Sequence, residues 1–182
     1  MPQSQEILTN YRKYLEGLVK SNSSERFSNG GIDFAPILMS VLFDNTRNTA
    51  RIYAQGFRPE LITRPEYWAS LTNFLNQYKT IQVLVETPEY RNEAPIRALE
   101  DASMRNPNIG VRLITDEDRR NFEETLGGHI NFAVFDKEKF RIEYDPNDFK
   151  AFGSFNDPET SGTLISLFDT AYANGENVFG MN

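Results

Sequence analysis

Any chemistry in this chain centres on one histidine. His129 is the only histidine among 182 residues, and it follows Gly127-Gly128 where a β-rich run begins. The chain has no cysteine, which excludes disulfides, thiolate zinc sites and cysteine nucleophiles. No acidic residues accompany His129 at a recognisable metal-ligand spacing, so we expect no metal and no cofactor. The polar residues that follow His129 in the chain include Asn131, Asp136, Ser154 and Asn156.

These residues form two short blocks. The first runs from His129 to Asp136, and the second is Gly153-Ser154-Phe155-Asn156. Together they resemble the phospholipase D-like superfamily, whose signature is H-x-K-x(4)-D followed by G-S-x-N. His129 and Asp136 stand at the expected offset, and the second block matches at its fixed positions. Asn131, however, stands where the family has lysine. The resemblance covers the chain from about residue 31 to residue 173.

The resemblance implies a phosphodiesterase mechanism that needs no metal. In that family two motifs meet in one site, from two halves of a chain or from two subunits. One histidine attacks the phosphorus and forms a phosphohistidine, while the other protonates the leaving oxygen. Because this chain has one motif, the resemblance implies a homodimer. It also implies that Ser154 and Asn156 lie beside His129 and bind phosphate oxygens.

Asn131 is the departure that bears most on function. A neutral amide cannot supply the positive charge that stabilises a phosphoryl transition state, and loss of one such donor costs about 2.7–4 kcal/mol. The family's nucleases also orient the histidine with a glutamate after the second block, and the nearest candidate here is Asp169. We therefore expect His129 to be a vestigial nucleophile or acid, without efficient turnover.

Each of these residues also has an ordinary structural interpretation. His129 is compatible with a polar residue at the start of a strand. Asn131 and Asn156 are compatible with the ends of turns, and Ser154 with a hydroxyl that bonds to the backbone. Asp136 fits the turn of a hairpin equally well, and the resemblance itself implies a structural role for it.

Helices and strands alternate along the chain. Apolar periodicity predicts helices over about residues 7–19, 33–42, 65–78, 95–105, 116–126 and 162–173. It predicts strands over 51–55, 81–85, 109–114, 130–135, 140–144 and 150–154. Residues 21–31, rich in Ser, Asn and Gly, predict a loop. We expect an N-terminal helix and loop over 1–28, then one phospholipase D-like α/β domain over 29–182. Its mixed, mostly parallel sheet would carry helices on both faces.

Composition and charge restrict the cellular location and the binding partners that we expect. The polar N-terminus and the lack of a long apolar run predict a cytoplasmic protein that does not enter the membrane. The chain has 19 Lys and Arg against 26 Asp and Glu, for a formal net charge of −7. Avid nucleic-acid binding is therefore disfavoured, because cations must displace the counterions of the phosphates.

Three functions stay open on this basis. The one we favour is a degenerate phospholipase D-like pseudoenzyme that acts as a dimeric binding, regulatory or scaffolding module. Such a module could bind a partner protein in a multicomponent system. The second is a weak metal-independent phosphodiesterase or nuclease that uses a phosphohistidine intermediate. The third is an unrelated α/β domain that binds a small ligand at its strand ends. Because Asn131 replaces lysine, an efficient enzyme is not expected.

Overall fold

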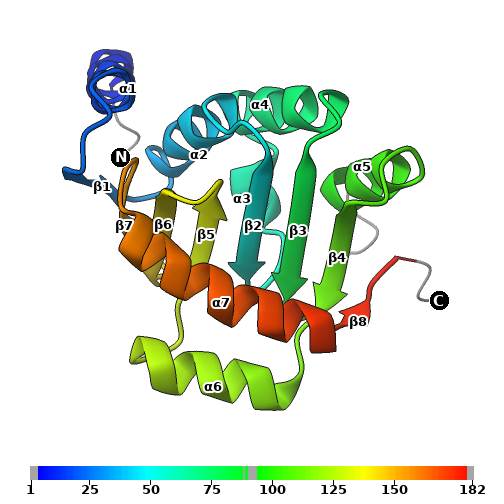
Figure 1. Ribbon diagram of the computed structural model, residues 1–182. Coiled ribbons are helices and arrows are strands. Elements are labelled where there is room, and N and C mark those ends of the chain that lie inside the picture. The colour runs from blue at the N-terminus through cyan, green and yellow to red at the C-terminus, as the bar shows by residue number, and fades with distance from the viewer. Residues whose placement is uncertain (1–3, 88, 90–93, 180–182) are drawn as a thin grey trace.

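The computed structural model describes residues 4–87, 89 and 94–179 (Figure 1). Its helices are α1 (Gln5–Lys20), α2 (Ala35–Asp44), α3 (Pro59–Ile62), α4 (Pro65–Asn76), α5 (Ala94–Ser103), α6 (Asp116–Leu126) and α7 (Pro158–Asn174). Its strands are β1 (Arg26–Gly30), β2 (Thr49–Ala54), β3 (Thr80–Val85), β4 (Ile109–Leu113), β5 (Asn131–Phe135), β6 (Lys139–Asp145), β7 (Lys150–Ser154) and β8 (Glu176–Asn177). Every predicted helix and strand has a counterpart, whereas β1, α3 and β8 were not predicted.

One mixed sheet contains the strands of the described chain, in the order β1-β7-β6-β5-β2-β3-β4-β8. Strand β3 pairs in parallel with β2 and with β4. The other neighbouring pairs are antiparallel. The mixed α/β domain is therefore confirmed, but the expected predominance of parallel pairing is wrong. The consecutive strands β5, β6 and β7 are joined by short connections, and such connections pair strands only in the antiparallel sense.

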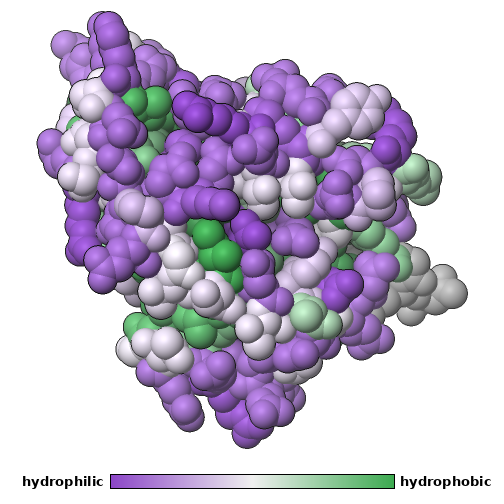
Figure 2. Space-filling model, in the orientation of Figure 1, coloured by the Kyte–Doolittle hydropathy of each residue, from purple (hydrophilic) through white to green (hydrophobic). Residues whose placement is uncertain are grey.

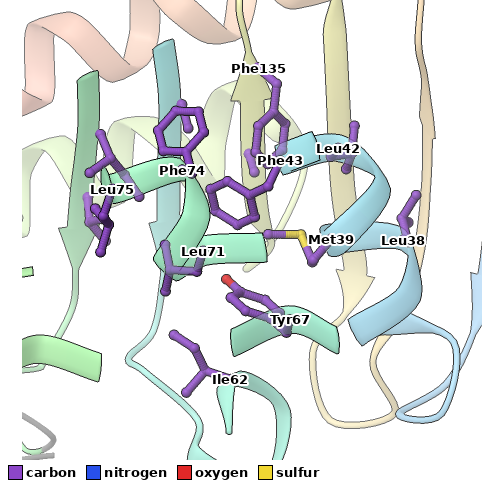
Figure 3. Close-up of a cluster of buried hydrophobic side chains, with 14 of the residues drawn as sticks. Leu38, Met39, Leu42, Phe43, Ile62, Tyr67, Leu71, Phe74, Leu75 and Phe135 are labelled. Atoms are coloured by element: carbon purple, nitrogen blue, oxygen red, sulfur yellow. The ribbon is translucent and has the colours of Figure 1, made fainter. Parts of the chain in front are cut away.

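Helices cover both faces of the sheet. We call the face that packs against α2, α3, α4 and α5 the α2 face, and the face that packs against α6 and α7 the α7 face. On the α2 face, the Phe43 ring lies 5.3 Å from those of Phe74 and Phe135 (Figure 3). On the α7 face, the Phe132 ring lies 5.5 Å from that of Phe122 and 6.4 Å from that of Phe168. The sheet is thus buried on both sides.

The N-terminal segment belongs to the same body. Leu15 and Leu18 of α1 are buried in the core of the α2 face, and β1 pairs with β7 along its whole length. The prediction of a loop over 21–31 is therefore wrong for residues 26–30, where Phe27 and Asn29 alternate with exposed residues. The expected domain boundary at residue 28 falls inside β1. No helix within the described ranges is long and apolar enough to cross a membrane.

Candidate functional site

Four segments meet at one end of the sheet, the lower end in Figure 1. Strands β2 and β3 run in parallel and β5 runs antiparallel to β2, so the residues that follow β2 and β3 lie beside those that precede β5. Gln55 follows β2, Glu86 follows β3, and His129 precedes β5. Helix α6 adds Glu123 from the α7 face. We call this group of four side chains the His129 edge.

His129 lies between carboxylates. Its Nε2 is 2.8 Å from Oε1 of Glu86 and 3.1 Å from Nε2 of Gln55. Its Nδ1 is 4.0 Å from Oε1 of Glu123. The nitrogen Nε2 can donate to Glu86 or accept from Gln55, but one nitrogen cannot do both at once. Both ring nitrogens therefore have an acidic neighbour, although the side chain as a whole is 43% exposed.

Glu86 is held in place from the α7 face. The hydroxyl of Tyr53 donates a hydrogen bond to Oε1 of Glu86, and the Tyr53 ring packs 4.8 Å from that of Phe122. Burial, helped by the neighbouring Glu86 and Glu123 carboxylates, raises the pKa of Tyr53. The phenol therefore remains a donor across the physiological pH range. Tyr53 fixes Glu86, and Glu86 in turn orients His129.

Asp169 does not perform this orienting role. Its carboxylate binds the guanidinium of Arg51 on the α7 face, with Oδ1 2.7 Å from Nε and Oδ2 3.2 Å from Nη2. Asp169, the nearest candidate by sequence for this role, is thus engaged with Arg51 instead. The acid that contacts His129 comes from the end of β3, far earlier in the chain.

Asn131 is engaged at both ends of its amide. Its Oδ1 accepts the backbone N–H of Gln55 at 3.1 Å, and its Nδ2 donates to Oε2 of Glu143 at 2.6 Å. Glu143 also accepts a hydrogen bond from Nη2 of Arg141 at 2.7 Å. All three of Asn131, Arg141 and Glu143 are buried. Where the resemblance calls for a lysine that faces phosphate, this chain has an amide bound to a buried carboxylate.

Ser154 and Asn156 lie at the opposite end of the sheet. Asn131 pairs with Glu143, and Glu143 with Ala151, whereas Ser154 pairs with Phe140 at the other end of β6. Three residues of strand separate the levels of Ala151 and Ser154, which is about 10 Å. The expected convergence of Ser154 and Asn156 on His129 is therefore wrong.

The local contacts of this second block are structural. The buried Ser154 hydroxyl accepts the backbone N–H of Asn156 at 3.2 Å, and the Asn156 amide donates to the carbonyl of Asn22 at 3.0 Å. These bonds fix the connection between β7 and α7 against the end of α1. The interpretation of Ser154 as a hydroxyl that bonds to the backbone fits this arrangement.

Asp136 has a structural role at the end of the sheet opposite to His129. Its carboxylate accepts the backbone N–H groups of Arg47, Asn48 and Thr49 at 2.8, 2.8 and 3.2 Å, and contacts the ammonium of Lys139 at 3.1 Å. It thereby ties the hairpin of β5 and β6 to the start of β2. Within the described residues, no group of three or more His, Cys, Asp or Glu side chains is arranged to hold a metal ion.

The sequence analysis missed Gln55, Glu86, Arg141 and Glu143. A signal for the last two was present, because Arg141 and Glu143 alternate with Phe140 and Ile142 in a predicted strand. A sheet covered on both faces buries the side chains that point to either face. Two opposite charges on one face of such a strand therefore predict a buried ion pair. Gln55 and Glu86 carried no comparable signal, since each is a single polar residue after a strand.

No protein-family model matches this chain, and no curated protein matches it. Solved structures do. Nuc, a phospholipase D family member from Salmonella typhimurium, superposes with a TM-score of 0.59 at 13% identity, over 84% of this chain and 98% of Nuc. TrmBL2, described as an archaeal chromatin protein with a novel mode of DNA binding, gives 0.58 at 10% identity, over 92% of this chain and 61% of TrmBL2.

NucT from Helicobacter pylori gives a TM-score of 0.58 at 13% identity, over 84% of this chain and 99% of NucT. At these identities the likeness concerns the fold. The chain therefore adopts the phospholipase D-like fold.

Proposed function

We propose that this chain is a degenerate phospholipase D-like domain that acts as a binding, regulatory or scaffolding module and lacks efficient phosphodiesterase activity. The observation that carries the proposal is the Asn131–Glu143 hydrogen bond, which replaces the expected lysine with an amide and a carboxylate. A phosphodiester bound at this position would lose the cation that stabilises its transition state. It would also approach a negatively charged group.

The surroundings of His129 support the same proposal. A phosphohistidine can form only if one ring nitrogen faces the phosphorus with its lone pair. Here Nε2 lies against Glu86, and Nδ1 faces Glu123. The guanidinium of Arg119, which contacts the same Glu123, lies 3.2 Å from Oε1 of Glu123 and 3.6 Å from Oδ1 of Asp116. Its charge is therefore shared between two acids and is not held for a substrate.

The proposal predicts negligible hydrolysis of a generic phosphodiester. Bis-p-nitrophenyl phosphate, incubated with micromolar protein in EDTA, should release nitrophenol no faster than with the His129→Ala variant. The comparison with that variant separates turnover at His129 from background hydrolysis. EDTA-resistant turnover that disappears in His129→Ala would overturn the proposal.

That contrary result would establish the second candidate, a weak metal-independent phosphodiesterase or nuclease. One observation favours this candidate: a half-exposed imidazole is oriented by a fixed carboxylate, which is the usual arrangement of a nucleophilic or basic histidine. The third candidate required an unrelated fold, and the observed phospholipase D-like fold contradicts it.

We propose further that the domain forms a homodimer whose twofold axis passes near His129. The basis is the resemblance, in which two motifs meet in one site, together with the exposure of His129 at the end of the sheet. Figure 2 shows that the surface seen from the α7 side is mostly hydrophilic, with small separate hydrophobic areas. Contacts on that side would therefore be largely polar. A partner protein in a multicomponent system would likewise bind to a mostly hydrophilic surface there.

A twofold axis duplicates any charge placed near it, which gives a direct test. Light scattering at tens of micromolar should give the dimer mass for the wild type and the monomer mass for His129→Glu, because the new carboxylates would repel one another across the axis. Thr163→Glu on α7 adds the same charge at an exposed position away from that axis and should remain dimeric. A monomeric wild type, or a dimeric His129→Glu variant, would contradict this interface.

A further inference from the structure

A cavity opens on the α2 face, at the segment that connects β2 to α4. Its volume is about 60 Å³, which is below the roughly 150 Å³ of a cavity that holds benzene and leaves room for a few water molecules or an ion of the size of acetate. Its walls are mostly apolar, and Figure 3 shows three of their side chains, Met39, Ile62 and Tyr67, projecting from α2, α3 and α4. The side chains of Ile52, Phe57, Leu61 and Val83 complete the apolar wall.

Two buried donors line this cavity with hydrogen-bonding capacity to spare. Arg141 uses Nε toward Asn29 at 3.4 Å and Nη2 toward Glu143 at 2.7 Å, while Nη1 has no acceptor in the part of the chain that the structure describes. The hydroxyl of Tyr67 likewise bonds to no residue within the described ranges. Arg141 and Tyr67 are each 5% exposed, and both side chains line the cavity, so these two donors are available to an occupant.

The hydrogen-bond donors around the cavity favour an acceptor as its occupant. Burial raises the pKa of Tyr67, so its hydroxyl is a donor at neutral pH. The acidic residue in the lining, Glu143, already has both oxygens bonded, to Asn131 and Arg141. Arg58 also lines the cavity, with its guanidinium 4.3 Å above the ring of Phe149. Arg58 pairs with Glu60 and Arg141 with Glu143, so what the lining offers an occupant is two donors, Nη1 of Arg141 and the Tyr67 hydroxyl.

We propose that this cavity binds a small organic anion. Its carboxylate would accept hydrogen bonds from the Tyr67 hydroxyl and from Nη1 of Arg141, and its apolar group would lie against Met39 and Ile62. The cavity volume limits the ligand to a short unbranched acid, of the size of acetate or propionate. His129 is not part of this site, so the proposal does not depend on whether the domain hydrolyses phosphodiesters.

Calorimetric titration of acetate and propionate tests this inference, with ethanol and 1-propanol as neutral counterparts. At least one acid should bind with a dissociation constant below about 1 mM, and its alcohol should bind at least tenfold more weakly. Tyr67→Phe removes one hydroxyl from the site and should weaken the acid by about 10-fold or more, as expected for a hydrogen bond to a charged group. Tyr172→Phe, which removes a hydroxyl on the α7 face, should leave the affinity unchanged.

The cavity-filling variant Ala54→Leu supplies a second readout, because it occupies the space without removing a donor. It should abolish binding while remaining folded, as judged by its thermal unfolding. The absence of binding by both acids at 10 mM would mean that the cavity holds water alone, and the inference would be wrong. Equal binding by the wild type, Tyr67→Phe and Ala54→Leu would place the acid elsewhere and would overturn it equally.

Discussion

Replacing Glu143 by alanine should lower the free energy of unfolding by about 3–5 kcal/mol, the usual effect of breaking a buried ion pair from one side. Glu143 is 4% exposed and Arg141 is 5% exposed. The variant leaves the Arg141 guanidinium buried without its counter-charge and removes the acceptor of the Asn131 amide. Because domains of this size are stable by about 5–15 kcal/mol in total, a large share of the stability would be lost.

Urea unfolding followed by circular dichroism measures this loss. Glu60→Ala is the matched control, because Glu60 also faces an arginine, Arg58, at 3.6 Å, but its side chain is 54% exposed. Exposed pairs of this kind contribute about 0–1 kcal/mol. If Glu143→Ala proves no more costly than Glu60→Ala, then the carboxylate beside Asn131 is not a buried partner of Arg141, and our description of this end of the sheet is wrong.

Asp136→Asn is expected to cost about 3 kcal/mol or more at neutral pH, because a charged acceptor of three backbone N–H groups and an ammonium becomes neutral. Burial alone would raise the pKa of Asp136. The N–H groups of Arg47, Asn48 and Thr49, with the Lys139 ammonium, outweigh burial and hold this pKa below its ordinary value of 3.8.

The sign of this pKa shift sets the pH dependence. A carboxyl whose pKa is lower in the folded state stabilises the fold fully above the unfolded pKa, and this stabilisation is lost as the pH falls through the folded value. The difference in unfolding free energy between wild type and Asp136→Asn should therefore be constant from about pH 5 to pH 8 and shrink below about pH 4. Asp148→Asn, at a side chain that is 64% exposed, is the control. A difference that persists unchanged at pH 2 would contradict the assignment.

The helices and strands were predictable because each depends on a local apolar pattern. The exceptions are α3, β8 and β1, and the last of these has the sequence Arg-Phe-Ser-Asn-Gly, in which polar residues conceal the alternation. Its inward-facing Asn29 belongs in a core only because Arg141 and the carbonyl of Phe149 bond to it. Those partners lie more than one hundred residues away, and no local window contains them.

The positions of Ser154 and Asn156 were within reach of the sequence and were nevertheless misjudged. Two motif blocks converge only if an odd number of strand reversals separates them. The predicted strands 130–135, 140–144 and 150–154 contain two reversals, which place Ser154 away from His129. By the same reasoning, the residue that returns to Asn131 is Glu143, at the end of β6. The contacts of Gln55 and Glu86 with His129 depend instead on how β2, β3 and β5 pair, which only the three-dimensional structure shows.

The most direct test of the account is whether phosphate reaches His129. Since His129 is the only histidine in the chain, its imidazole C–H resonances report on this position alone in a proton NMR spectrum. We predict that phosphate added to tens of millimolar, at constant pH and with chloride as the ionic-strength control, moves these resonances no further than chloride does. The reason is that Glu86 and Glu123 lie against the His129 ring, and that Asn131, where the resemblance requires a lysine, is bound to Glu143. A saturable shift with a dissociation constant below about 1 mM would contradict the account, because it would show a working phosphate site beside His129.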